Sequence, residues 1–307
     1  MSSWKQIIKS GTHHINRYPT FKQLIRRVIK LLPGSELSYK LRSATEREWD
    51  EETFQSKLGK FIFYYPSRSE IGLYVDEFGI WNDFSLLFQK LIRKPRVIIE
   101  VGANIGTDTL SIAQLAPKTC KIIAFEPVDR YRDILKKNIA INHLRNIEVY
   151  EYFVSSVGGE TETLQINTTS ASVIPNASSS FPTIGTQRVI TITLDDFVRK
   201  NRISTLDLLK TDTDGFDEEV ISGAKETIKR FRPFLFVEFS GYQLKRARGT
   251  SNETFAKLLH GLGYNKFMLF PGQRAQYIDL NDYRELLRHL NHEGSFDVLA
   301  IPQEKTL

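Results

Sequence analysis

The sequence predicts an α/β protein built on a doubly wound, mostly parallel sheet, with a helical N-terminal extension ahead of it. From Val97 onward, apolar strand segments alternate with helical segments, the order expected when crossover helices cover both faces of a parallel sheet. A glycine-containing turn, Gly102 to Gly106, joins the first strand to the first helix, and Glu126 ends the second strand. Open α/β sheets bind ligands at the carboxyl ends of their strands, so both features lie where a site is expected.

The individual elements follow from short apolar runs and from apolar residues spaced three or four apart. We expect five parallel strands, at Val97–Val101, Lys121–Phe125, Asn146–Val154, Leu206–Lys210 and Phe234–Phe239. The helices between them are expected at Thr107–Leu115, Tyr131–Ile141 and Phe216–Phe231. Two later segments, Lys266–Phe270 and Phe296–Ile301, predict a terminal antiparallel pair.

The composition is that of an ordinary globular protein, with 307 residues of which 41% are hydrophobic and 25% charged. A single cysteine, Cys120, excludes an internal disulfide and a cysteine-based zinc site. No segment has the length of a membrane span, and no apolar leader precedes a small-residue cleavage site, so we expect a cytoplasmic protein. The six histidines have no metal-ligand spacing, and we predict no metal site.

The net charge of +6 is a mild basic bias. The basic residues do not gather near the predicted strand ends, so we expect no nucleic-acid partner. Residues 1–60 are expected to form an extension that contains a basic amphipathic helix between Phe21 and Leu32, and residues 61–307 a single domain. This helix either packs on its own domain or makes weak contact with an anionic membrane surface.

The turn after the first strand favours a nucleoside cofactor without a pyrophosphate. A dinucleotide fingerprint G-x-G-x-x-G would need glycine at positions 104 and 107, where Asn104 and Thr107 stand. The spacing that is present, Glu100-x-Gly102-x-Asn104-x-Gly106, matches the turn of Rossmann-like S-adenosylmethionine (SAM) methyltransferases, with Asn replacing the middle glycine. Such a turn needs glycine where the backbone passes the ligand, and an acid that receives the ammonium of the methionine moiety.

The end of the second strand agrees with this interpretation. A carboxylate that accepts both ribose hydroxyls is expected about 20 residues after the first glycine of the turn, and Glu126 lies close to that position. The candidate cofactor-binding residues are therefore Glu100, Gly102, Ala103, Asn104, Gly106, Glu126 and Pro127.

A larger set of motifs resembles the FkbM family of SAM-dependent methyltransferases. The set consists of Val101-Gly102-Ala103-Asn104-Ile105-Gly106, Phe125-Glu126-Pro127 followed by Leu135, Asn138 and Asn142, Thr193-Leu194-Asp195-Asp196, Leu208 to Gly215, and Val237-Glu238. The resemblance runs from about Phe61 to Ile301. It implies the SAM-dependent methyltransferase fold, S-adenosylmethionine as cofactor, and methyl transfer to a hydroxyl of a sugar, glycolipid or secondary metabolite. The family's usual Asp and Glu are replaced by Glu100 and Asp214.

Methyl transfer to oxygen requires a group that takes the proton of the acceptor hydroxyl, and a nearby carboxylate is the expected base. Asp212, at the end of the fourth strand, is the first candidate to contact the acceptor or the methionine moiety, and Glu238, at the end of the fifth, is the second. Asp214 is a third candidate, but its spacing to Asp217 favours a helix N-cap. We interpret Asp195-Asp196 as the start of another helix.

Two further segments are candidates for acceptor recognition. Asn167 to Gln187 is rich in Ser, Thr, Asn and Pro, and is either a lid or a solvated insertion. Tyr64, Tyr65 and Trp81 either line the pocket or form part of a packed N-terminal cover. The leading functional hypothesis is a SAM-dependent O-methyltransferase acting on a small-molecule or glycan acceptor. The alternative is a catalytically inactive SAM-binding scaffold of a biosynthetic complex.

Overall fold

The computed structural model describes residues 53–66, 87–88, 91–166, 171–172, 185–270, 277–290 and 295–305. The chain divides into two compact units, and the one that contains the large sheet comprises residues 54–65 and 69–307. The predicted basic helix near Arg26, Trp81 and most of the segment Asn167–Gln187 lie outside the described residues. The division of the chain at about residue 60 stays a prediction.

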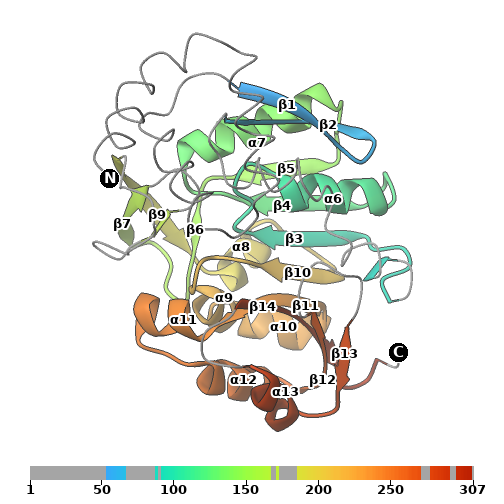
Figure 1. Ribbon diagram of the computed structural model, residues 1–307, viewed down its shortest axis with the longest axis vertical. Coiled ribbons are helices and arrows are strands. Elements are labelled where there is room, and N and C mark those ends of the chain that lie inside the picture. Colours follow the sequence, from blue (N-terminus) through green and yellow to red (C-terminus); the bar gives the residue numbers. More distant parts are fainter. Residues whose placement is uncertain are drawn as a thin grey trace, which may run out of the picture. The chain divides into compact units, whose positions relative to one another are not determined.

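An eight-stranded sheet forms the centre of this unit, in the order β13-β12-β14-β11-β10-β3-β4-β5 (Figure 1). Its parallel part contains β3 (Val97–Val101), β4 (Lys121–Phe125), β5 (Ile147–Tyr150), β10 (Leu208–Thr211) and β11 (Phe234–Ser240). The antiparallel part contains β12 (Tyr264–Phe270), β13 (Ile278–Leu280) and β14 (Ser295–Pro302). The predicted fold class and the antiparallel pair are thereby confirmed.

Helices connect these strands and cover both faces of the sheet. They are α6 (Thr107–Leu115), α7 (Asp129–Ile141), α8 (Leu194–Lys200), α9 (Asp217–Ser222), α10 (Lys225–Phe231), α11 (Gly241–Arg248), α12 (Asn252–Gly261) and α13 (Tyr283–His289). In the part of the chain that the structure describes, no helix combines the length and apolar character that a membrane crossing requires.

Two smaller sheets accompany the large one. The first pairs β1 (Thr53–Leu58) with β2 (Phe61–Pro66). The second has the order β6-β9-β7-β8 and is built from β6 (Phe153–Val154), β7 (Thr161–Ile166), β8 (Ala171–Ser172) and β9 (Gly185–Ile192).

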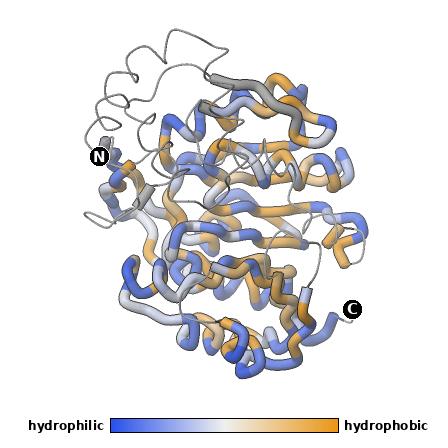
Figure 2. Tube along the Cα trace, in the orientation of Figure 1, coloured by the Kyte–Doolittle hydropathy of each residue, from blue (hydrophilic) through white to orange (hydrophobic). Residues whose placement is uncertain are grey.

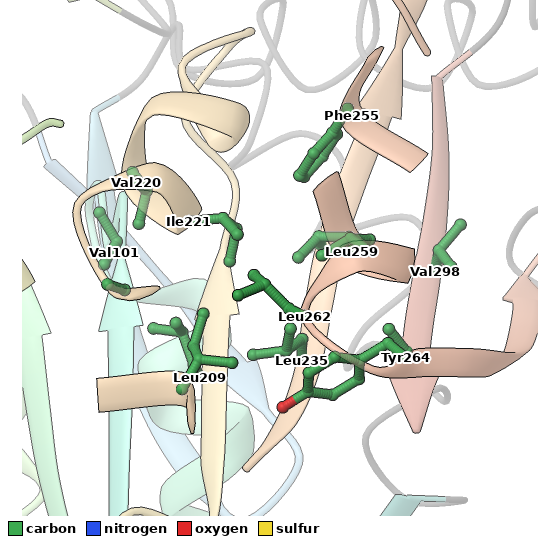
Figure 3. Packing of buried hydrophobic residues seen from close by; sticks show 14 of the residues in the cluster. Val101, Leu209, Val220, Ile221, Leu235, Phe255, Leu259, Leu262, Tyr264 and Val298 are labelled. Carbon is green, nitrogen blue, oxygen red and sulfur yellow. The ribbon is translucent and has the colours of Figure 1, made fainter. Parts of the chain in front are cut away.

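Alternation along the strands divides the core between the two faces of the sheet. Ile99 and Leu209 belong to the larger apolar cluster, which packs under α8, α9, α10 and α12, and part of this cluster is drawn in Figure 3. Ile98 and Leu208 point the other way and pack with Ile112 of α6. The central strands are accordingly among the most hydrophobic parts of the trace in Figure 2, as expected for parallel strands buried on both faces. Residues 100 and 210 follow the second pattern and face α6.

Two sequence predictions of single elements are wrong. The strand expected at Asn146–Val154 is two strands, because β5 pairs with β4 in the large sheet whereas β6 pairs with β9 in the small one. The helix expected at Phe216–Phe231 is interrupted at Gly223, whose backbone lies so close to β6 that a Cβ there would be 2.1 Å from the Ser155 carbonyl oxygen. Asp195 and Asp196 lie in the first turn of α8, as expected. The Asp195 side chain also accepts from the backbone N–H groups of Glu226 and Thr227 in the first turn of α10, a contact that the sequence did not predict.

Candidate active site

The turn after β3 is held against the ends of both neighbouring strands. The backbone N–H groups of Gly102 and Ala103 both donate to the carbonyl oxygen of Phe125, at 3.1 and 3.0 Å, which fixes the turn to β4. On the β10 side, a Cβ at Gly102 would lie 2.0 Å from the carbonyl oxygen of Asp212. Gly102 has φ +85° and Gly106 φ +98°, a conformation that favours glycine. The predicted glycines are therefore required by the backbone itself.

Glu126 is hydrogen-bonded to the backbone on both of its carboxylate oxygens. Oε2 accepts from the N–H of Asn104 at 2.7 Å and Oε1 from the N–H of Val128 at 2.9 Å. The structure thus joins the two motifs that the sequence placed on consecutive strand ends. Asn104 also orders the turn through its own side chain, which accepts from the N–H of Ile105 at 2.8 Å. Burial raises the pKa of Glu126 to about 7, partly offset by these two hydrogen bonds.

The corner that follows Glu126 is fixed by Arg132, which the sequence interpretation missed. Its guanidinium donates to the carbonyl oxygens of Glu126 and Pro127, at 3.1 and 2.9 Å. Pro127 also accepts from the side chain of Gln187 at 3.0 Å. Ala103 packs with Leu135 of α7 in a small apolar cluster. Ala103 thus anchors the turn to α7, and Pro127 belongs to the neighbouring corner that follows Glu126.

Glu100 lies deeper than the sequence suggested. Its side chain is fully buried, and its Oε2 accepts from the hydroxyl of Thr109 on α6 at 2.6 Å. Its Oε1 has no hydrogen-bond partner and lies 3.9 Å from the ammonium of Lys210, the residue paired with it across β3 and β10. Burial raises the pKa of Glu100 to about 7, and Lys210 opposes this shift. Because Glu100 is fully buried, a ligand at the surface of the turn would contact neighbouring residues and not the Glu100 carboxylate.

Lys210 is the centre of this buried cluster. Its ammonium lies 2.7 Å from Asp108, 3.4 Å from Asp212 and 3.9 Å from Glu100. Burial alone would lower the pKa of Lys210, but the three carboxylates outweigh that effect and hold it well above its usual value. Lys210 and Asp108 were not among the predicted site residues. A lone lysine in the buried strand Leu208–Thr211 was the available signal, because an ammonium in such a place needs a partner.

The three predicted catalytic carboxylates lie at one edge of the sheet but differ in their surroundings. Asp212 is the accessible one, with 46% of its side chain exposed beside Lys210. Glu238 is partly buried and faces Asp297 across β11 and β14. Its pKa is raised well above the usual value, first by burial and then by the charges of Asp212, Asp217 and other nearby acids. Glu238 therefore holds its proton to a higher pH than an ordinary glutamate does.

Asp214 does not cap the following helix, so that prediction is wrong. Helix α9 begins at Asp217 after Phe216, and no side chain caps it. Asp214 has φ +53° and accepts from the side chain of Gln243 on α11 at 3.0 Å. The carboxylate that orders this loop is Asp217, which accepts from the Thr211 hydroxyl at 2.6 Å and the Thr213 hydroxyl at 3.0 Å. Asp217, the second acid of the expected capping motif, thus bonds to the end of β10.

Acidic side chains outnumber basic ones at this edge among the described residues. Lys210 and Arg132 stand against Glu100, Asp108, Glu126, Asp212, Asp214, Asp217 and Glu238. Within the described residues, no three His, Cys, Asp or Glu side chains form a group that could hold a metal ion. The excess of negative charge suits an organic cation.

The chain is similar to several known methyltransferases. The chain is 28% identical over 167 residues to the 2-O-methyltransferase NoeI of Sinorhizobium fredii, a match that covers 50% of this chain and 68% of NoeI. Among solved structures it resembles a methyltransferase FkbM from Methylobacillus flagellatus, with 12% identity, a TM-score of 0.42, and coverage of 94% of this chain and 60% of that one. A SAM-dependent O-methyltransferase from Thermotoga maritima gives 10% identity, a TM-score of 0.42, and coverage of 87% and 83%.

The family model of the FkbM methyltransferase domain matches residues 100–284. This range is more than half of the chain, and it contains the glycine turn, Glu126, the Lys210 cluster and Glu238. The chain therefore belongs to the FkbM methyltransferase family, and it is an enzyme that uses S-adenosylmethionine as its methyl donor.

Proposed function

We propose that this enzyme methylates a hydroxyl oxygen of a sugar-containing or related small-molecule acceptor, and that Asp212 takes the proton of that hydroxyl. The observation that carries the proposal is the position of Asp212. It is an accessible carboxylate at the end of β10, its backbone touches the cofactor turn at Gly102, and Lys210 lies 3.4 Å from its side chain. The similarity to NoeI, which is named as a 2-O-methyltransferase, supports oxygen as the acceptor atom.

The residues at the turn fit S-adenosylmethionine, a molecule with a sulfonium, an ammonium and a carboxylate. Oε1 of Glu100 and Oδ1 of Asp108 have no hydrogen-bond partner, and the single ammonium of Lys210 faces the three carboxylates of Glu100, Asp108 and Asp212 under the turn. Such a site favours a cationic ligand over its neutral demethylated product. Each carboxylate oxygen of Glu126 accepts one backbone N–H and keeps a lone pair for a ribose hydroxyl.

When bound, the cofactor supplies an electrophilic methyl group on a good leaving group, so the protein has to position the acceptor and remove its proton. We assign the latter role to Asp212, because its exposed carboxylate can accept the hydroxyl proton as the oxygen attacks. The ammonium of Lys210 orients the Asp212 carboxylate by donating a hydrogen bond to its Oδ2. To Glu238, whose pKa is raised by burial and by neighbouring acids, we assign a hydrogen bond donated to the acceptor beside Asp212.

The test is a methyl-transfer assay with radiolabelled cofactor across mono- and oligosaccharides, glycolipids, phenols and amines. We expect label in hydroxylated acceptors, and in Asp212→Asn a fall in kcat of about 10²–10⁴-fold, the usual contribution of a general base, with cofactor affinity nearly unchanged. Asp279→Asn, an exposed aspartate on the edge strand β13, is the matched control and is expected to keep full activity. Amine-only methylation would contradict the acceptor class. Weakened cofactor binding with normal turnover in Asp212→Asn would contradict its role as base.

A further inference from the structure

Asn138 of α7 is fully buried, and its carboxamide makes three hydrogen bonds to two separate segments of the chain. Oδ1 accepts from the N–H of Tyr64 at 2.6 Å, and Nδ2 donates to the carbonyl oxygen of Tyr64 at 2.9 Å. Nδ2 also donates to the carbonyl oxygen of Ile105 in the cofactor turn at 2.8 Å. One amide nitrogen thus links strand β2 to the turn.

Asn142, one helical turn later, makes the same two kinds of hydrogen bond to β2. Its Oδ1 accepts from the N–H of Ile62 at 2.8 Å and its Nδ2 donates to the carbonyl oxygen of Ile62 at 2.6 Å. Its third bond goes to the carbonyl oxygen of Asn138 and stays within α7. Asn142 therefore holds β2 without touching the turn.

The two asparagines present to β2 the donors and acceptors that a neighbouring strand would present. Four residues of helix rise about 6 Å, and two residues of strand advance about 6.6 Å, so residues 138 and 142 match residues 64 and 62. Between and after these anchored positions, Phe63 and Tyr65 are buried, and their rings stack at 6.1 Å. Strand β2 is thus fixed to α7 through its backbone, while two of its side chains are buried in the protein.

The turn depends on the same contact because its remaining polar groups are already committed. The N–H of Ile105 is bonded to the Asn104 side chain, the N–H of Gly106 to the carbonyl of Ala103, and the N–H of Asn104 to Glu126. The carbonyl oxygen of Ile105 is held by Asn138. A buried carbonyl that loses its partner is costly, so release of β2 and loosening of the turn favour each other.

We propose that Asn138 is a positioning residue that couples the docking of strand β2 to the binding of S-adenosylmethionine at the turn. This inference rests on the proposed role of the turn in cofactor binding. Occupancy of the turn stabilises the conformation in which Ile105 faces Asn138, and that conformation holds β2 in place. Because SAM binding and β2 docking are linked through Asn138, each stabilises the other by the same amount.

The experiment combines calorimetry of SAM binding with hydrogen exchange of the full chain, for the wild type, Asn138→Leu and Asn142→Leu. We expect faster exchange at residues 61–65 in both variants. Asn138→Leu should also bind SAM about tenfold more weakly and lose the additional protection of β2 that SAM gives the wild type, whereas Asn142→Leu, which keeps the bond to Ile105, should lose clearly less affinity. At saturating SAM, its kcat should remain close to that of the wild type.

Asn138→Asp, which keeps the shape and one acceptor but removes the Nδ2 donor, serves as the second variant if Asn138→Leu does not fold, and the same results are expected. Equal loss of affinity in the Asn138 and Asn142 variants would overturn the proposal, because it would show a general loosening of α7. Wild-type affinity in a folded Asn138 variant would overturn it as well, while leaving cofactor binding at the turn intact. Absence of SAM binding in the wild type would instead overturn the function on which the proposal rests.

Discussion

At the scale of single residues, Lys210 is the side chain on which the charge balance of the site depends. Its side chain is 3% exposed, and its ammonium lies near the buried carboxylate of Glu100 and the largely buried one of Asp108. We expect Lys210→Met to abolish methyl transfer and to lower the free energy of unfolding at neutral pH by about 3–5 kcal/mol, the usual cost of leaving buried charges without a partner. Urea unfolding measures this change.

The pH dependence of this effect separates charge from packing. Without Lys210, the pKa values of Glu100 and Asp108 rise further, since its charge lowers both of them. Protonation at about pH 5 then removes the uncompensated charges, and the difference in stability between Lys210→Met and the wild type should shrink. A deficit of the same size at pH 5 and pH 7.5 would show that the lysine contributes mainly by filling space.

Glu126 is expected to make cofactor affinity depend on pH. Its pKa is about 7 because of burial, with the charges of Arg132 and Asp214 acting in opposite directions. The ionised form is the better acceptor for ribose hydroxyls, so SAM affinity should rise as the pH increases through about 7. Glu126→Gln should bind at least about tenfold more weakly, since hydrogen bonds to a charged group contribute about 1.5–3 kcal/mol, and should lose this rise.

Calorimetry of both proteins between about pH 6 and pH 8 tests the assignment. Glu100 titrates in the same range and is retained in Glu126→Gln. Any pH dependence that survives in the variant therefore belongs to Glu100 or to another buried acid of the site, such as Asp217, whose pKa is about 6. Identical pH profiles in the two proteins would exclude Glu126 as the titrating group.

At the scale of elements, the contact between the β3 turn and the end of β10 sets the geometry of the site. In Gly102→Ala, the new Cβ would lie 2.0 Å from the carbonyl oxygen of Asp212 at φ +85°. In Gly159→Ala, the φ is +82° and no atom lies within 4 Å. Both variants incur about 1–2 kcal/mol of backbone strain, and only the first forces the turn away from β10.

We therefore expect Gly159→Ala to lose about 1–2 kcal/mol of stability and to keep its affinity for SAM. Gly102→Ala should lose clearly more stability and bind SAM at least about tenfold more weakly. The added Cβ pushes the turn away from the Asp212 backbone, so the residues of the site are no longer held in position. Thermal unfolding and calorimetry give both quantities. Equal losses in the two variants would mean that strain, and not the close approach, determines the result.

The elements that the sequence predicted correctly are those with a strong local signal. The helix Thr107–Leu115 and the strands Val97–Val101 and Lys121–Phe125 were predicted with their observed limits, because glycine, proline and periodic apolar residues mark them. The break at Gly223 was not predicted, and the close approach of its backbone to the Ser155 carbonyl, far away in the chain, has no local signal in the sequence. The division between β5 and β6 likewise depends on partners, not on local sequence.

The site shows the same division between local and long-range information. Spacing alone located the turn and Glu126, and these were found adjacent. The depth of Glu100 could not be read from spacing, because it follows from pairing with Lys210 on β10. The motif pattern drew attention to Asn138 and Asn142, but their role depends on β2, about 75 residues earlier in the chain.

At the scale of the whole molecule, the buried acids of the site reduce stability as the pH rises. In the folded protein the pKa values of Glu100 and Glu126 are about 7 and that of Asp217 is about 6, whereas in the unfolded chain they lie near 4. Between these values the folded state holds more protons than the unfolded state. The free energy of unfolding therefore falls as the pH rises from about 4.5 to 7.

Cofactor binding should act in the opposite direction. Without ligand, we expect a lower Tm at about pH 7.5 than at pH 5.5, and Glu126→Gln should flatten this slope, because its carboxyl alone contributes on the order of 3 kcal/mol. Saturating SAM should raise the Tm more at pH 7.5, where Glu126 is ionised and binding is tighter. Differential scanning calorimetry of the two proteins, with and without SAM, tests this. A ligand-free Tm that rises steadily from pH 5.5 to 7.5 would show that these carboxyls are already ionised at the lower pH, and the charge balance assigned to the site would then be wrong.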